Sequence, residues 1–157
     1  MKEPNKLWYD LINRFSEQSR CIGRNVGCVI VKDDFQMSEG WNSPPGQLCT
    51  SMCDRCKSNT PSGEKLEQAI CSHAEANAIG HCARHGRSTQ GADIYTTVFP
   101  CKYCFDLIII SGIKSVYYIH EYKDSNIHKE RLKDSIDIYK LQEIYIEDKL
   151  HVRAVAV

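Results

Sequence analysis

The chain has 157 residues, of which 42% are hydrophobic and 25% are charged. This length and balance predict a single globular domain, residues 1–157, that buries roughly two-thirds of the surface exposed by its unfolded chain. The 20 Lys and Arg side chains balance the 20 Asp and Glu side chains to a formal net charge of zero, which excludes a general attraction to nucleic acids or acidic membranes.

The start, Met1–Asn5, has no apolar segment, and no stretch approaches the roughly 20 apolar residues of a membrane span. We therefore expect a soluble, cytoplasmic protein without a membrane partner. The chain has 9 cysteines. Without a secretory signal they are expected to be reduced thiols and metal ligands rather than disulfides.

The first elements in chain order are a helix and a hairpin. Apolar residues recur with helical spacing from Leu7 to Phe15, which predicts an amphipathic helix over residues 5–19. The run Val26–Val31 is rich in β-branched residues, and Phe35–Trp41 follows it after a polar turn. Two such runs separated by a few polar residues predict a β-hairpin.

A long polar loop follows, over about residues 42–71. Loops of this length are uncommon in compact domains unless they are functional or tied down. Its cysteines are Cys49, Cys53, Cys56 and Cys71. Four thiols could hold a second, structural zinc that staples the loop, with Cys21 able to replace any one of them. The same residues could equally be unligated thiols.

Beyond the loop the chain alternates helices and strands. The predicted elements are a helix over His73–His85, a strand over Asp93–Val98, a helix from Pro100 to Ile110, a strand over Lys114–Ile119, a helix through Leu132, Ile136 and Tyr139, and a short strand over Glu143–Ile146. This order predicts an α/β fold with one mixed sheet of about five strands and helices on both faces.

A split motif carries the chemistry. His73 and Glu75 open one predicted helix, and Cys101 and Cys104 open the next, on one face of it. One imidazole nitrogen and two thiolates form a soft tripod for zinc and leave the fourth tetrahedral position for water. Glu75 can reach that water without binding the metal, as proton transfer at a zinc site requires.

The complete motif is the signature of zinc-dependent nucleobase deaminases: a His, a Glu two residues later, and a Pro-Cys-x2-Cys that opens another helix. In such enzymes a water activated by zinc attacks the amidine carbon of cytosine or adenine. The Glu takes a proton and delivers it to the ring nitrogen and the leaving ammonia. The motif therefore predicts zinc as the cofactor and Glu75 as the catalytic residue.

Longer runs resemble one family in particular. The runs that closely resemble deoxycytidylate (dCMP) deaminases are Ser72–Ile79, Gly91–Cys104 and Ile109–Tyr118. Upstream, Gly40–Pro45 is similar to that family's Gly-Tyr-Asn-Gly-x-Pro loop, with Trp41 and Ser43 in place of Tyr and Gly. The resemblance implies a cytidine-deaminase-like three-layer sandwich. It also implies conversion of dCMP to dUMP, which supplies thymidylate synthesis.

The same resemblance implies roles for further residues. The implied substrate-binding residues are Arg24, Asn42, Ala74 and Tyr122, with Asn42 holding the sugar and Arg24 facing the 5′-phosphate. Ser43 and Arg84 match positions of an effector site. Many family members are hexamers activated by dCTP and inhibited by dTTP. We therefore expect a homo-hexamer with these effectors, and Mg²⁺ accompanying a triphosphate effector.

Three alternatives stay open from the sequence. A deaminase of bases in RNA or single-stranded DNA shares the zinc site but needs a basic groove, and the zero net charge argues against a nucleic-acid partner. A non-catalytic zinc module would use the cysteines for structure alone. Activity on dCTP as well as dCMP is compatible with the same residues.

Overall fold

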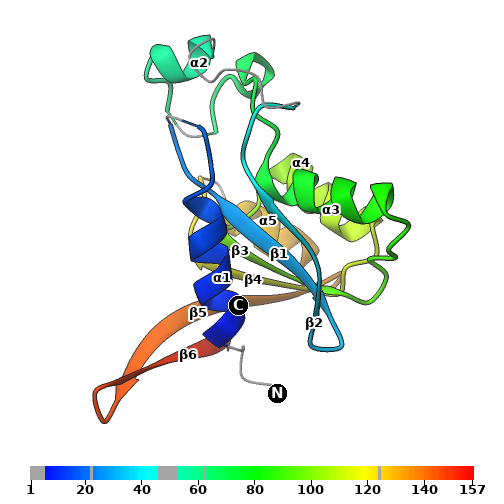
Figure 1. The fold of residues 1–157 in the computed structure, drawn as a ribbon, viewed down its shortest axis with the longest axis vertical. Helices are drawn as coiled ribbons and strands as arrows, with labels where there is room; N and C mark the ends of the chain where they lie inside the picture. The colour runs from blue at the N-terminus through cyan, green and yellow to red at the C-terminus, as the bar shows by residue number, and fades with distance from the viewer. Residues whose placement is uncertain (1–5, 22, 46–52, 62, 124) are drawn as a thin grey trace.

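The computed structural model describes residues 6–21, 23–45, 53–61, 63–123 and 125–157, apart from the side chain of residue 56. Figure 1 shows a sheet with helices on both sides and a long C-terminal hairpin that projects from one end. The helices are α1 (Lys6–Ser16), α2 (Asp54–Lys57), the 3₁₀ turn η3 (Leu66–Gln68), α3 (Ala74–Arg84), α4 (Lys102–Ile110) and α5 (Ser125–Leu132). The strands are β1 (Gly27–Lys32), β2 (Phe35–Trp41), β3 (Asp93–Val98), β4 (Ser115–His120), β5 (Asp137–Ile146) and β6 (Lys149–Ala156).

The sheet has six strands in the order β2-β1-β3-β4-β5-β6. Its centre, β3-β4-β5, is parallel, whereas β1 and β2 on one side and β6 on the other run antiparallel to their neighbours. Parallel neighbours need crossover connections, which α4 and α5 provide. The predicted mixed α/β sheet is confirmed, with six strands rather than about five.

Each face of the sheet has its own core. On one face α1 packs through Trp8 and Ile12 against β1 and β3. On the other face α3 and α4 contribute Ala78, Phe105 and Ile108 to a second core. Figure 1 shows α1 alone on its side of the sheet and α3, α4 and α5 together on the opposite side. The expected three-layer sandwich with helices on both faces is therefore confirmed.

Both hairpins close through an acidic pair with left-handed backbone angles. Asp33 and Asp34 join β1 to β2 with φ values of 52° and 64°, and Glu147 and Asp148 join β5 to β6 with φ values of 50° and 59°. Two adjacent residues with positive φ are typical of a type I′ turn, whose twist matches that of the paired strands. The hairpin predicted over residues 26–41 is confirmed to within one residue.

The C-terminal segment differs from the prediction. The last helix, α5, ends at Leu132, whereas Ile136 and Tyr139 were expected to continue its apolar stripe. Ile136 instead precedes β5, and the Tyr139 ring stacks on that of Tyr117 with their centroids 4.8 Å apart. Pairing with β4 buries β5 on both faces at this end, so tertiary contacts override the helical spacing. The final strand β6 was not predicted.

Candidate metal centre and active site

The first turn of α3 is held tightly against β2. The Asn77 amide donates a hydrogen bond to the Trp41 carbonyl at 2.8 Å. Gly40 lies so close to the helix that a Cβ on it would be 2.1 Å from the carbonyl oxygen of Ala74. A side chain cannot occupy that space, so glycine allows the strand to approach the helix this closely. The residues at the start of α3 therefore take their positions from β2.

The start of α4 is held by the end of β4 and by aromatic packing. The Phe99 N–H donates a hydrogen bond to the His120 carbonyl at 2.8 Å. The Phe99 ring packs against Phe105 and Tyr118, with ring centroids 5.3 and 5.0 Å away. Cys101 is the N-cap of α4. Its place, and that of the helix turn after it, is therefore fixed by buried neighbours.

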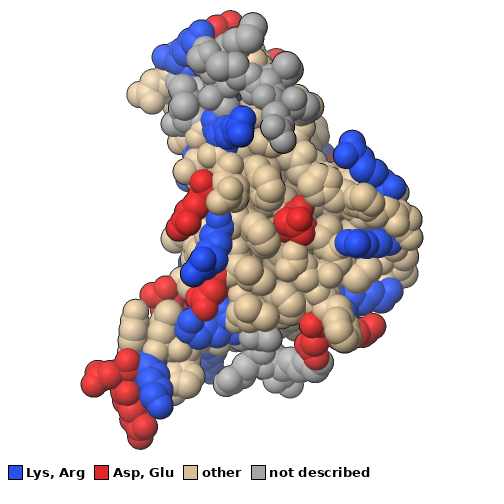
Figure 2. Space-filling model, in the orientation of Figure 1, with Lys and Arg blue, Asp and Glu red and all other residues tan. Residues whose placement is uncertain are grey.

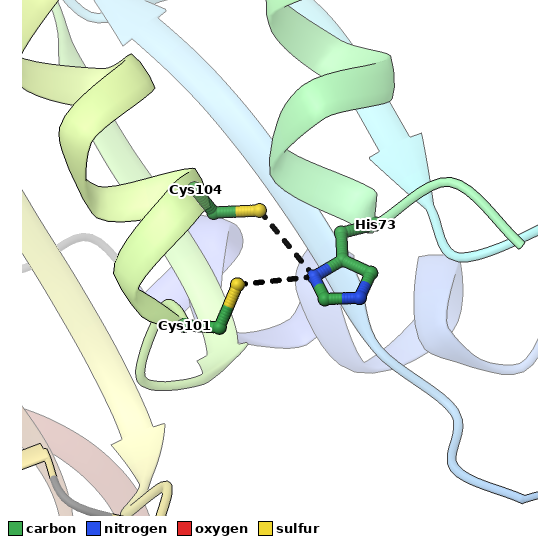
Figure 3. A group of neighbouring side chains, drawn as sticks. All are labelled: His73, Cys101 and Cys104. Carbon is green, nitrogen blue, oxygen red and sulfur yellow. Dashed lines mark hydrogen bonds between the residues drawn. The ribbon is translucent and has the colours of Figure 1, made fainter. Parts of the chain in front are cut away.

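His73 and two cysteines converge between these two helix starts, as Figure 3 shows. The Nδ1 atom of His73 lies 3.4 Å from the Sγ atom of Cys101 and 3.4 Å from that of Cys104. One imidazole nitrogen offers either one proton or one lone pair, so it cannot make both contacts as directional hydrogen bonds. Equal contacts to two sulfurs are what a shared metal ion would produce.

The three donor atoms fit zinc. With Zn–S bonds of about 2.3 Å and a Zn–N bond of about 2.0 Å, tetrahedral coordination separates the nitrogen from each sulfur by roughly 3.5 Å. All three donor atoms lie within 4.8 Å of one another. Three protein ligands leave one position open, as in catalytic zinc sites. Within the described part of the chain, no other such group of three or more His, Cys, Asp or Glu side chains forms.

The charge state of the tripod follows from its contacts. The hydrogen bond from Cys104 lowers the pKa of Cys101 to about 4, whereas the same contact and burial raise the pKa of Cys104. The contact with Cys101 raises the pKa of His73, while burial and the positive charge of Arg55 oppose that shift. A bound divalent cation favours thiolate at both cysteines and a neutral imidazole.

Glu75 supplies a buried carboxylate beside the tripod. It lies in the first turn of α3 and is only 4% exposed. Burial raises its pKa, and the positive charge of His73 opposes the rise. A raised pKa makes a carboxylate a stronger base, which favours its use in general acid–base catalysis. Its position therefore suits proton transfer, the role predicted for Glu75 from the sequence.

A cavity of about 310 Å³ opens onto the tripod. This volume is typical of a small-molecule site. The predicted catalytic, metal and substrate residues that line it are His73, Glu75, Cys101, Arg24, Asn42, Ala74 and Tyr122. All four predicted substrate residues are thus brought to the same cavity as the metal centre.

Asn42 shapes one wall of this cavity. Its Oδ1 accepts the Val26 N–H at 2.7 Å, and its Nδ2 donates to the Arg24 carbonyl at 2.5 Å. Asn42 is 8% exposed. A side-chain amide has more hydrogen-bonding capacity than these two bonds use. Asn42 can therefore brace the loop before β1 and contact a ligand.

Several lining residues were missed by the sequence analysis. Arg55, Asn59 and Thr60 reach the cavity from the segment that begins with α2, and Phe99 reaches it beside Cys101. The length of the loop indicated a functional role, but single polar residues in an aperiodic segment carry no spacing that would show which of them face the site.

The predicted effector residues do not share a site within the chain. Ser43 forms a backbone bridge to Ser72, next to the first turn of α3. Arg84 lies at the other end of that helix, in a depression of about 330 Å³. This depression is also lined by His81, His85 and Arg87. Ser43 is not among its lining residues.

The cysteines expected at a second zinc are only partly described. Cys49 lies outside the described residues, and so does the side chain of Cys56. Cys53 is buried and Cys71 is half-buried, and both line the cavity beside the tripod. Cys21, the suggested replacement, lines the same cavity. The second zinc stays a prediction.

The surface carries both signs of charge. On the face that Figure 2 shows, basic and acidic side chains of the described residues are interspersed, without a continuous basic groove. Such a groove would be expected on a protein that tracks a nucleic-acid backbone. Across the described ranges, no helix has the length and apolar character needed to cross a membrane.

Comparison with protein families gives a match over residues 2–120 to the cytidine and deoxycytidylate deaminase zinc-binding region. The chain belongs to this deaminase family. The resemblance stated from the His73, Glu75, Cys101 and Cys104 motif is thereby confirmed. The family description also agrees with zinc as the ion for the tripod.

Individual relatives are moderately similar to the chain. ComE operon protein 2 of Bacillus subtilis is 31% identical over 142 residues, which cover 84% of this chain and 69% of that protein. The deoxycytidylate deaminase of Saccharomyces cerevisiae is 34% identical over 111 residues, which cover 69% of this chain and 35% of the yeast protein. The chain therefore spans about a third of the yeast enzyme's length.

A solved structure shows the same fold. It is the dCMP deaminase of cyanophage S-TIM5 in complex with dCMP and dUMP. Its TM-score is 0.73 at 27% identity, and the match covers 89% of this chain and 98% of that one. The cytidine-deaminase-like fold expected from the sequence is confirmed.

Proposed function

We propose that this chain is a zinc-dependent deaminase that converts dCMP and water to dUMP and ammonia, and so supplies dUMP for thymidylate synthesis. The proposal rests above all on one observation: the buried Glu75 borders a cavity large enough for a small ligand, together with His73 and Cys101 of the tripod that Cys104 completes. Two of the similar proteins support the substrate, since one is a deoxycytidylate deaminase and the other holds dCMP and dUMP.

The metal would contribute Lewis-acid chemistry. Zinc held by His73, Cys101 and Cys104 would lower the pKa of water toward neutrality. The two thiols come from the start of α4 and the imidazole comes from the start of α3. At both helix starts, backbone N–H groups and the helix dipole favour negative charge. The same helix end stabilises the ionised form of Glu75.

Glu75 moves the protons. It takes one proton from the attacking water and delivers it to N3 of the cytosine, as the water oxygen bonds to C4 and the ring loses its C=N bond. It then passes the second proton of that oxygen to the exocyclic nitrogen. The C4–N bond breaks, ammonia leaves, and C4 becomes a carbonyl. The N3 proton stays in dUMP, so the atoms balance.

The test compares the wild-type protein with Glu75→Gln, which keeps the shape of the side chain and removes its ability to carry a proton. Loss of general acid–base catalysis predicts a kcat for dCMP lowered by roughly 10²- to 10⁴-fold, with unchanged zinc per chain. Glu17→Gln, a change at an exposed position on the loop after α1, is the matched control and keeps full activity.

The substrate panel decides between the alternatives. Ammonia release is measured with dCMP, dCTP, CMP, deoxycytidine and a cytosine-containing oligonucleotide. Activity on the oligonucleotide alone identifies a nucleic-acid deaminase and overturns the proposal. Equal activity on dCTP widens the substrate class. Absence of activity in both wild type and Glu75→Gln, with zinc bound, identifies a structural zinc module.

Regulation and assembly extend the proposal. We expect activation by dCTP with Mg²⁺, inhibition by dTTP, and a homo-hexamer. The depression at Arg84 supports an anionic effector, because two arginines, Arg84 and Arg87, line it with His81 and His85 against one acidic residue, Glu39. Kinetics with each effector in wild type and Arg84→Ala test the regulation, and sedimentation tests the assembly. Rates that do not change with either effector refute the proposed regulation.

Counting zinc in the same sample tests the second metal site, because it gives two ions per chain if the second zinc exists.

A further inference from the structure

One side of the cavity is covered by the segment that contains α2 and η3. We call residues 53–61 and 63–71 the cap segment. Four residues of the cap segment that line the cavity are Arg55, Asn59, Thr60 and Gly63. The first three have polar side chains. The cap segment therefore supplies polar groups to a ligand that fills the cavity.

Charge is distributed unevenly among the described lining residues. Their acidic side chain is Glu75, which is buried beside the metal tripod. Their two cationic side chains of fixed charge are Arg24 and Arg55, which are exposed and half-buried respectively. The cavity is thus anionic at its buried end and cationic toward solvent. A ligand with a neutral base and an anionic outer end complements this distribution.

Arg55 is held in place by the backbone of its own segment. Its Nε donates to the Glu64 carbonyl at 2.7 Å, and its Nη2 donates to the Pro61 carbonyl at 3.2 Å. A guanidinium has more N–H donors than these two bonds use. The group can therefore hold the cap segment and bind an anion at the same time. Because it is already ordered, less side-chain entropy is lost when it binds an anion.

The cap segment also contacts the loop after β4. Glu64 pairs with Lys123, with the Oε1 and Nζ atoms 3.1 Å apart. A Cβ built on Gly63 would lie 3.1 Å from the hydroxyl of Tyr122. Tyr122 lines the cavity as well. Arg55 is thus tied, through Glu64 and Gly63, to the second loop that faces the ligand.

We propose that Arg55 is a specificity-determining residue that binds the 5′-phosphate of the nucleotide substrate from the cap segment, together with Arg24 from the loop before β1. A planar guanidinium binds phosphate through paired, charge-assisted hydrogen bonds, which neutral side chains cannot replace. The chain then prefers a nucleoside monophosphate over a nucleoside. This inference rests on the proposed function for the identity of the base.

The experiment compares binding of dUMP and of 2′-deoxyuridine to the zinc-loaded protein by calorimetry, and kcat/KM for dCMP. Three proteins are used: wild type, Arg55→Ala and Lys123→Ala. Arg55→Ala is expected to weaken dUMP binding and to lower kcat/KM for dCMP by roughly 10- to 100-fold. Its affinity for 2′-deoxyuridine stays within about threefold of wild type, since that ligand has no phosphate.

Lys123→Ala is the matched control for a structural role. It breaks the exposed ion pair that ties the cap segment to the neighbouring loop, and exposed pairs contribute little. Both ligands should bind it within about threefold of wild type. Equal weakening of dUMP and 2′-deoxyuridine in Arg55→Ala overturns the proposal, because Arg55 would then only support the loop. Unchanged dUMP binding in that variant overturns it too.

The same data separate this inference from the proposed function. If wild type prefers dUMP over 2′-deoxyuridine, Arg55→Ala abolishes this preference and no substrate is deaminated, the phosphate site is supported and the proposed reaction is refuted. If wild type deaminates dCMP and Arg55→Ala retains the preference for dUMP, the reaction is supported and the role of Arg55 is refuted.

Discussion

Substituting Gly40 by alanine should damage catalysis more than stability. The added Cβ would lie 2.1 Å from the carbonyl oxygen of Ala74 and 2.8 Å from the backbone nitrogen of Ala78. Both atoms belong to the backbone of α3, so no side-chain rotation relieves the overlap. The helix must move away from β2, and His73 and Glu75 move with its first turn.

The size of the effect follows from this overlap. Carbon and oxygen atoms in contact are separated by more than 3 Å, so α3 must shift by about 1 Å. Overpacking of this kind costs about 1–3 kcal/mol of unfolding free energy. A displacement of about 1 Å at catalytic groups lowers turnover by roughly 10²-fold. The activity loss is therefore expected to exceed what the fraction of unfolded protein explains.

Gly27→Ala is the matched comparison. Its Cβ would lie 2.2 Å from the Ile12 carbonyl oxygen and 2.4 Å from the Ser16 nitrogen, both in the backbone of α1. The overlap is equally severe but lies on the face of the sheet opposite α3. Urea unfolding, zinc content and kcat for dCMP are measured for both variants. Gly80→Ala, where a Cβ meets nothing within 4 Å, should stabilise α3 by about 0.5–1 kcal/mol and leave kcat unchanged.

The reasoning is refuted if Gly40→Ala and Gly27→Ala lose activity in equal proportion to their stability. It is also refuted if Gly40→Ala retains full kcat, because α3 would then accommodate the Cβ without moving the tripod.

Two further predictions concern an ion network and the metal. Burial alone would raise the pKa of Glu121, but hydrogen bonds led by that from Lys129 lower it to about 2. The stabilisation is therefore present above the usual pKa of 4.5 and is lost as pH falls toward 2. Because the Glu121 side chain is 42% exposed, screening reduces the contribution to about 1 kcal/mol. Glu121→Gln should lower the free energy of unfolding at pH 7 by that amount. Urea denaturation at pH 6 and at pH 3 should show a smaller loss of stability between these pH values in Glu121→Gln than in wild type. Cys104→Ser should lower the bound zinc by about one ion per chain and lower the melting temperature. Cys82→Ser, at a buried thiol outside the tripod, should keep its zinc. An unchanged zinc content in Cys104→Ser would contradict the ligand assignment.

The central elements could be predicted because their signals are local. The hairpin at Asp33 and Asp34 has a polar two-residue turn between β-branched and aromatic runs, and β3 is confirmed at Asp93–Val98. Each half of the metal tripod could be predicted for a similar reason, because Cys101 and Cys104 lie within one helical turn and His73 opens another helix. The meeting of the two halves depends on contacts between distant elements, and it was predicted only from the complete deaminase motif.

The errors arise where distant contacts decide the structure. The spacing of Leu132, Ile136 and Tyr139 fits a helix, yet Tyr139 is paired with Tyr117 in a parallel ladder. Strand β6 did carry a signal, since Leu150, Val152 and Ala154 are the less exposed residues in an alternating run. The cap segment carried none: Arg55 faces the cavity only because Pro61 and Glu64 fold back onto it.

The stacked tyrosines of the sheet give the protein an internal optical probe. The rings of Tyr95, Tyr117 and Tyr139 lie nearly parallel, with centroids 4.4 and 4.8 Å apart across β3, β4 and β5. Chromophores this close couple electronically and should give a strong near-ultraviolet circular dichroism band that disappears when side-chain packing is lost. Tyr95 and Tyr117 belong to the core beneath α1, on the opposite face from α3. The contribution of these three rings therefore reports on the sheet, and a variant that loses zinc but keeps the band has been altered at the metal centre without loosening the scaffold.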